Sequence, residues 1–292
     1  MQPNPPFTKL VKGGFSMNHS KPVVCLDAGH YGKYNRSPVV PEYYESDMVW
    51  KLHILLKQQL ERRGIAVTTT RSSQDKDLAL VERGKCSKGA DLFLSLHSNA
   101  ASAAKPDWVV GICSVKDADS DVDDRSRQIA TDLTAAVAKI MGVDYQITSR
   151  ESAADRDGDG RKDDYYGVLR GAYSVGTPGV ILEHGFHTHQ ATAHWLLNQD
   201  NLEQLAQTEA EVIARWLEVK PLELNLPQLC RGAKNNTVGA LQILLNGYGA
   251  SLSVDGIFGA ATDGAVRRYQ KDKRLEIDGI VGPATWRALM GI

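Results

Sequence analysis

Two histidines and a glutamate stand where expected strands and helices end or begin. His30 follows the apolar run of residues 21–27, and His97 follows a second apolar run, residues 91–96. Glu45 directly precedes an expected helix. Because the carboxyl ends of parallel strands meet at one edge of a sheet, we expect these three side chains to converge. Two imidazoles and one carboxylate, with a fourth position open to water, form a typical catalytic zinc site.

A further glutamate, Glu183, ends the apolar run VILE of residues 180–183. A carboxylate in this position is costly to bury unless it has a task. Beside an activated water it would act as general base and then return the proton to the leaving group. The structural alternative is a helix cap or a salt bridge. Glu42 lies three residues before Glu45 and is the alternative carboxylate for the metal site.

The elements that must position these residues alternate between strands and helices. Apolar, β-branched runs predict strands, and apolar residues at helical spacing predict helices. Strands are expected at residues 21–27, 65–70, 91–96, 109–115 and 180–183, and helices at residues 46–63, 78–88, 123–141 and 201–219. This alternation predicts an α/β fold with a mostly parallel sheet flanked by helices.

The last part of the chain has its own organisation. Two prolines bracket residues 221–227, which is typical of a linker. After it, DGIFGAAT at residues 255–262 is repeated as DGIVGPAT at residues 278–285. Each copy predicts a glycine-rich turn followed by a helix, and a third helix is expected at residues 236–246. These observations predict a small C-terminal three-helix domain.

Length and composition fit two soluble domains. The chain has 292 residues, a formal charge of −1, and no apolar run near the roughly 18–20 residues that span a membrane. Near-neutrality argues against nucleic acid as the main partner. Four cysteines without a CxxC pair exclude a disulfide scaffold and a thiolate zinc finger. We expect a disordered lead over residues 1–20, a catalytic domain over 21–219, a linker over 220–227 and the small domain over 228–292.

Several dispersed motifs occur in an order typical of one enzyme family. They are VCLDAGHYG at residues 24–32, YESD at 44–47, ADLFLSLHSN at 90–99 and VILEHGF at 180–186. Over residues 22–217 the chain resembles the zinc-dependent N-acetylmuramoyl-L-alanine amidases of bacterial cell walls and phage lysins. The resemblance implies zinc held by His30, Glu45 and His97, with Glu183 catalytic. It also implies cleavage of the amide between the lactyl group of N-acetylmuramic acid and L-alanine.

The repeat region resembles the small three-helix peptidoglycan-binding domain over residues 228–290. The implied role is to hold the enzyme on bacterial peptidoglycan, which raises the local substrate concentration. The residues that touch the wall are not part of the motif; Arg268, Tyr269 and Trp286 are the candidates. This region carries eight Lys and Arg against five Asp and Glu, a balance of +3. We expect neither a nucleic acid nor a membrane partner.

Other functions remain open at this stage. A zinc peptidase that cuts within the stem peptide would use the same ligands, and a non-catalytic wall-binding protein would use the same tail. Residues 1–20 lack the apolar segment of a signal peptide. We therefore expect synthesis in the cytoplasm and action on the cell wall, after lysis as a phage endolysin or by another route as an autolysin.

Three further patterns carry expectations. Asp155, Asp157 and Asp159 resemble the start of a calcium loop, although position 12 is Tyr166 and not Glu. His187 and His189 are a rival metal pair, with a solvated loop as the alternative. Finally, Arg71 and Arg83 are expected to pair with carboxylates within the fold.

Overall fold

The computed structural model describes residues 21–101, 107–114, 121–156, 162–220 and 226–291. The chain divides into two compact units, Met1–Val219 and Lys220–Ile292. The calcium candidates Asp157 and Asp159 lie outside the described residues.

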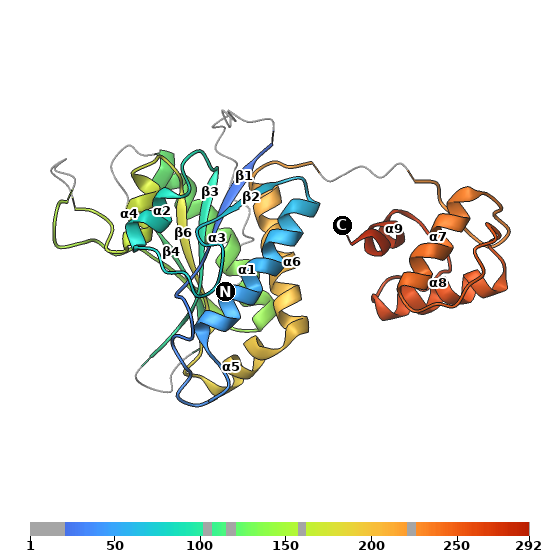
Figure 1. The fold of residues 1–292 in the computed structure, drawn as a ribbon, viewed down its shortest axis with the longest axis horizontal. Helices are drawn as coiled ribbons and strands as arrows, with labels where there is room; N and C mark the ends of the chain where they lie inside the picture. Colours follow the sequence, from blue (N-terminus) through green and yellow to red (C-terminus); the bar gives the residue numbers. More distant parts are fainter. Residues whose placement is uncertain (1–20, 102–106, 115–120, 157–161, 221–225, 292) are drawn as a thin grey trace, which may run out of the picture. The chain divides into compact units, whose positions relative to one another are not determined.

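The first unit is built on a six-stranded sheet, among the residues that the structure describes (Figure 1). Its strands are β1 (Val23–Ala28), β2 (Ala66–Thr69), β3 (Leu92–Asn99), β4 (Trp108–Cys113), β5 (Asp144–Thr148) and β6 (Gly179–Phe186). The order is β2-β1-β3-β6-β4-β5. Strands β2, β1, β3 and β6 pair in parallel, whereas β4 pairs antiparallel with β6. Strand β5 is parallel to β4. The expected mostly parallel α/β sheet is confirmed.

Helices cover both faces of this sheet (Figure 1). They are α1 (Glu45–Arg62), α2 (Leu80–Lys85), α3 (Asp121–Met141), α4 (Gly167–Tyr173), α5 (Gln190–Leu197) and α6 (Gln199–Trp216). On one face α6 contacts both α1 and α3, and on the other face α2 packs against α4. The sequence did not predict β5, α4 or α5, because β5 is largely exposed and α4 contains two glycines.

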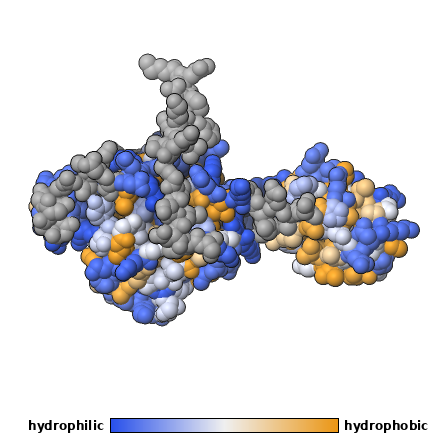
Figure 2. Space-filling model, turned by 90° about the horizontal axis from the view of Figure 1, so that it is seen from above, coloured by the Kyte–Doolittle hydropathy of each residue, from blue (hydrophilic) through white to orange (hydrophobic). Residues whose placement is uncertain are grey.

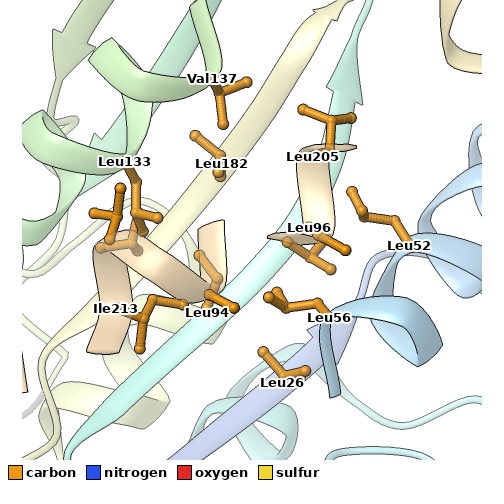
Figure 3. Packing of buried hydrophobic residues seen from close by; sticks show 14 of the residues in the cluster. Leu26, Leu52, Leu56, Leu94, Leu96, Leu133, Val137, Leu182, Leu205 and Ile213 are labelled. Atoms are coloured by element: carbon orange, nitrogen blue, oxygen red, sulfur yellow. The ribbon is translucent and has the colours of Figure 1, made fainter. Parts of the chain in front are cut away.

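A leucine-rich core fills the space between the sheet and α1, α3 and α6. Figure 3 shows Leu94 and Leu96 of β3 beside Leu182 of β6, surrounded by helix side chains such as Leu56 and Ile213. All five are fully buried. Burial of this apolar surface is the main force that holds the strand ends, and with them the polar residues, in place.

On the opposite face, two glycines let α2 and α4 touch backbone to backbone. A Cβ atom on Gly84 would overlap the carbonyl oxygen of Val168, and one on Gly171 would overlap that of Val81. The close approach of the two helices explains why α4 is helical although it contains Gly167 and Gly171 and glycine lowers helix propensity.

The second unit contains α7 (Asn236–Gly247), α8 (Ala260–Asp272) and α9 (Pro283–Met290) around their own apolar core. Gln242 of α7 fixes the first copy of the repeat. Its Nε2 donates to Oδ1 of Asp255 (2.8 Å) and to the carbonyl oxygen of Ile257 (3.1 Å). Its Oε1 accepts the backbone N–H of Gly256 (3.0 Å).

Gln270 of α8 does the same for the second copy. It donates to Asp278 (2.8 Å) and to the carbonyl oxygen of Ile280 (2.9 Å), and it accepts the N–H of Gly279 (2.9 Å). Gly279, like its counterpart in the first copy, has a φ of 70°, which favours glycine. The repeated DGI motif is therefore a glutamine-clamped turn that occurs twice.

The surface of each unit mixes apolar and polar side chains on the face that Figure 2 shows. Among the described residues, no helix is long and apolar enough to cross a membrane. Cys25 and Cys113 are buried, whereas Cys86 and Cys230 are exposed. Cys25 is a core residue, and its burial raises the pKa of the thiol to about 12.

Candidate active site

The structure brings His30, Glu45 and His97 together. His30 lies just beyond β1 with a φ of 57°, Glu45 is the first residue of α1, and His97 lies within β3. Each offers a donor atom, and these atoms lie within 4.8 Å of one another. Glu42 is exposed and belongs to no such group among the described residues.

Glu45 is the centre of this group. Its Oε2 lies 3.2 Å from Nε2 of His30, and its Oε1 lies 2.9 Å from Nδ1 of His97. Asn35 donates to Oε2 (2.7 Å), and the backbone N–H of Ser98 donates to Oε1 (3.0 Å). Burial of Glu45 favours protonation, but the hydrogen bonds with the two histidines outweigh it and lower the pKa of the carboxyl group. Glu45 is therefore a buried anion.

A hydrogen-bond chain behind His97 fixes the orientation of its ring. Ser95 donates its hydroxyl proton to Oδ2 of Asp27 (2.7 Å), so its oxygen is free to accept from Nε2 of His97 (3.2 Å). Nδ1 is thereby directed toward Glu45. Gly29 packs directly against the same ring, where a Cβ atom would overlap it. Burial opposes protonation of His97, but Glu45 outweighs it and raises the pKa of His97 to about 9.

Glu183 lies beside this group on β6, as the register partner of His97 on β3. Its Oε2 is buried and has no hydrogen-bond partner among the described residues. Burial raises the pKa of Glu183, His97 lowers it and Glu45 raises it, with a net value of about 7. A carboxyl group with this pKa can both take up and release a proton near neutrality.

The model of the N-acetylmuramoyl-L-alanine amidase family matches residues 24–215. The chain belongs to this family. A second family, described as "Putative peptidoglycan binding domain", matches residues 234–289. The first unit is thus a domain of the N-acetylmuramoyl-L-alanine amidase family.

Solved structures share the fold of the amidase domain. One is the catalytic domain of CwlV, an amidase from Bacillus (Paenibacillus) polymyxa var. colistinus, with 20% identity, 68% of this chain and 99% of that chain covered, and a TM-score of 0.55. Another is an amidase from Clostridium difficile 630, with 20% identity, coverage of 69% and 100%, and a TM-score of 0.56.

One curated relative matches a shorter stretch. The zinc D-Ala-D-Ala carboxypeptidase of Streptomyces albus G is 45% identical over 64 residues. The match covers 21% of this chain, and the chain spans only 25% of the length of that relative.

A buried ion pair in contact with His97 was not predicted from the sequence. Nε2 of His184 lies 2.9 Å from Oε1 of Glu209 on α6, and neither side chain is exposed. Nδ1 of His184 lies 2.9 Å from the carbonyl oxygen of His97. Because both ring nitrogens face acceptors, the geometry favours the imidazolium form. The VILEHGF motif contains His184, but its partner lies 25 residues away, and helical spacing alone gives no sign of it.

The described residues support neither of the two other metal sites expected from the sequence. The described residues contain one group of three candidate donors, and neither His187 nor His189 belongs to it. Nδ1 of His187 lies 3.1 Å from the carbonyl oxygen of Ser98, and His189 is a surface residue near Asp107. Of the calcium candidates, only Asp155 is described, and it is exposed, so nothing supports a calcium site.

The two arginines stabilise the loops around His30 in different ways. Arg83 pairs with Asp27 (3.5 Å) and Asp77 (3.1 Å), as expected. For Arg71 the expectation is wrong: within the described residues its guanidinium binds backbone carbonyl oxygens, including those of Ala28 and Gln74. Backbone carbonyl oxygens thus take the place of the expected carboxylate.

Proposed function

We propose that the protein hydrolyses the amide between the lactyl group of N-acetylmuramic acid and the L-alanine of the stem peptide. The two family assignments support the reaction class and the peptidoglycan substrate. The observation that carries the proposal is the convergence of His30, Glu45 and His97 beside Glu183, whose buried Oε2 has no hydrogen-bond partner in the described part of the chain.

We infer that His30, Glu45 and His97 hold a zinc ion. Two imidazoles and a carboxylate are a donor set that zinc prefers at catalytic sites. The bond from Nε2 of His97 to Ser95, supported by Asp27, is the kind of outer contact that orients a ligating imidazole. Binding through Nδ1 would release the proton that Glu45 favours there. When bound, zinc supplies Lewis acidity toward a carbonyl oxygen and water.

Glu183 carries the proton through the reaction. As the water oxygen bonds to the lactyl carbonyl carbon, Glu183 takes one of the water protons. As the carbon–nitrogen bond breaks, Glu183 gives that proton to the departing nitrogen of L-alanine. The products are a lactyl carboxylic acid on the glycan and a peptide with a free amino terminus. The pKa of about 7 suits both transfers.

Mass spectrometry of fragments released from purified walls tests the bond that is cut. We expect intact stem peptides that begin with a free L-alanine amino group. Fragments cut inside the stem peptide would identify a zinc peptidase instead, and release of no fragments would identify a wall-binding protein without catalysis.

A Glu183→Gln variant tests the proton carrier. We expect loss of fragment release with retained binding to walls, because the amide cannot take up the water proton. Glu211→Gln, which neutralises an exposed glutamate, serves as the control and should keep full turnover. If the Glu183 variant released fragments at the normal rate, another group would have to carry the proton.

A further inference from the structure

A hollow of about 340 Å³ lies between the end of α7 and α8 in the second unit. Its volume falls in the range typical of small-ligand sites. The buried side chains of Leu245 and Ala265 are part of its apolar lining, together with Ala250. The hollow therefore offers apolar contacts to small aliphatic groups.

A half-exposed tyrosine forms one wall of the hollow. Tyr248 is 49% exposed, yet its hydroxyl donates to the carbonyl oxygen of Leu289 (3.2 Å), and its ring lies 4.8 Å from the ring of Tyr269. These contacts hold the ring in place while one side stays open to solvent. A fixed, open aromatic surface is preorganised for binding, because little side-chain entropy is lost on contact.

Positive charge dominates the rim. Arg268 has neither an ion pair nor a side-chain hydrogen bond with any other described residue, although Asp272 lines the same hollow. Nζ of Lys273 lies 5.4 Å from the centre of the Tyr248 ring. Two cations against one anion, in a region with a balance of +3, favour an anionic ligand.

We propose that this hollow binds the stem peptide of peptidoglycan, with peptide carboxylates at Arg268 and Lys273 and alanine methyl groups on the apolar lining. A stem peptide combines both features, whereas an uncharged glycan would leave Arg268 without a partner. The inference rests on the proposed function for the identity of the ligand. Trp286, the other aromatic candidate, is 2% exposed and donates its indole N–H to the carbonyl oxygen of Pro227, so it is a core residue.

The test follows backbone amide NMR signals of α7 and α8 in the full-length Glu183→Gln protein, which does not consume the ligand. The probes are a stem tetrapeptide, the same peptide with amidated carboxylates, and an uncharged N-acetylglucosamine oligosaccharide. We expect saturable shifts with the tetrapeptide and binding that weakens with added salt. Amidation or Arg268→Ala should each raise Kd at least about tenfold, because a charge-assisted hydrogen bond is lost.

Arg287→Ala is the matched control, because it removes an exposed arginine from α9, outside the hollow, and changes the net charge equally. It should leave Kd unchanged. Absence of shifts with the tetrapeptide, equal Kd for the amidated peptide, or shifts with the oligosaccharide alone would overturn the proposal. Fragment release by the wild-type enzyme is measured separately, so that failure of the hollow with intact amide cleavage leaves the proposed function standing. Peptide binding without cleavage would overturn only the proposed function.

Discussion

At the scale of single residues, the position of His97 depends on the absence of a side chain at Gly29. The imidazole occupies the space where a Cβ atom on that glycine would stand. Its Nε2 is meanwhile tied to Ser95 and, through Ser95, to Asp27. The ring is thus positioned by Gly29 on one side and by Ser95 on another. Both residues lie near strand ends that the sequence analysis singled out only for their histidines.

Gly29→Ala is expected to displace the His97 ring and weaken metal binding more than it weakens the fold, because the overlap is with a side chain at the site. The measurement is zinc affinity by competition with a chromophoric chelator, alongside the unfolding temperature with excess chelator. Gly32→Ala is the control variant, because a Cβ atom on this nearby glycine would meet nothing within 4 Å, although its φ of 57° adds some backbone strain. Equal zinc affinity for Gly29→Ala and the wild type would contradict the packing argument.

The buried pair of His184 and Glu209 predicts a pH-dependent stability. Burial opposes protonation of His184, but Glu209 outweighs it and raises the pKa of His184 above its ordinary value. The pair therefore stabilises the fold fully below the unfolded pKa of about 6.5, and its contribution is lost as pH rises through the higher folded pKa.

Glu209→Gln should lower the free energy of unfolding by about 2 kcal/mol at pH 5.5. The difference from the wild type should shrink as pH rises through the folded pKa of His184. Chemical denaturation at several pH values measures both. Glu211→Gln on the same helix is the control, where an exposed pair contributes less than about 1 kcal/mol. A difference that grows with pH would reverse the assigned charge state.

At the scale of elements, the contact between α2 and α4 depends on Gly84 and Gly171. Gly171→Ala should destabilise the amidase domain by about 1–3 kcal/mol, because backbone atoms of α2 cannot yield as a flexible side chain can. Gly264→Ala in the interior of α8 meets no atom within 4 Å and should stabilise the second unit by about 0.5–1 kcal/mol. Thermal unfolding measures both, and effects of the same sign would refute the argument.

The same contact shows what sequence reasoning can reach. Buried strands and long amphipathic helices repeat apolar residues at fixed spacing, so β1, β3, β6, α1, α3 and α6 were predicted. Helix α4 was missed because its stability comes from a neighbour that is distant in sequence. Likewise the histidines could be found from strand ends, whereas Asp27 and Glu209 act through partners that only the folded chain brings close.

At the scale of the whole molecule, the two units have separate apolar cores. Calorimetry should therefore resolve two unfolding transitions. Chelation should lower only the transition of the amidase domain, because a ligand stabilises the unit that binds it, by about 4 kcal/mol at a thousand times Kd. Glu45→Gln should abolish the response to chelator. A shift of both transitions, or of neither, would contradict the assignment of the metal to His30, Glu45 and His97.

The distribution of thiols has a practical consequence. Each unit presents one exposed cysteine, Cys86 in the first and Cys230 in the second, while Cys25 and Cys113 are enclosed. Maleimide dyes should therefore label the native protein at one position in each unit without any engineered residue. Energy transfer between the two dyes would then report, in real time, whether the distance between the two units changes when the protein binds a cell wall.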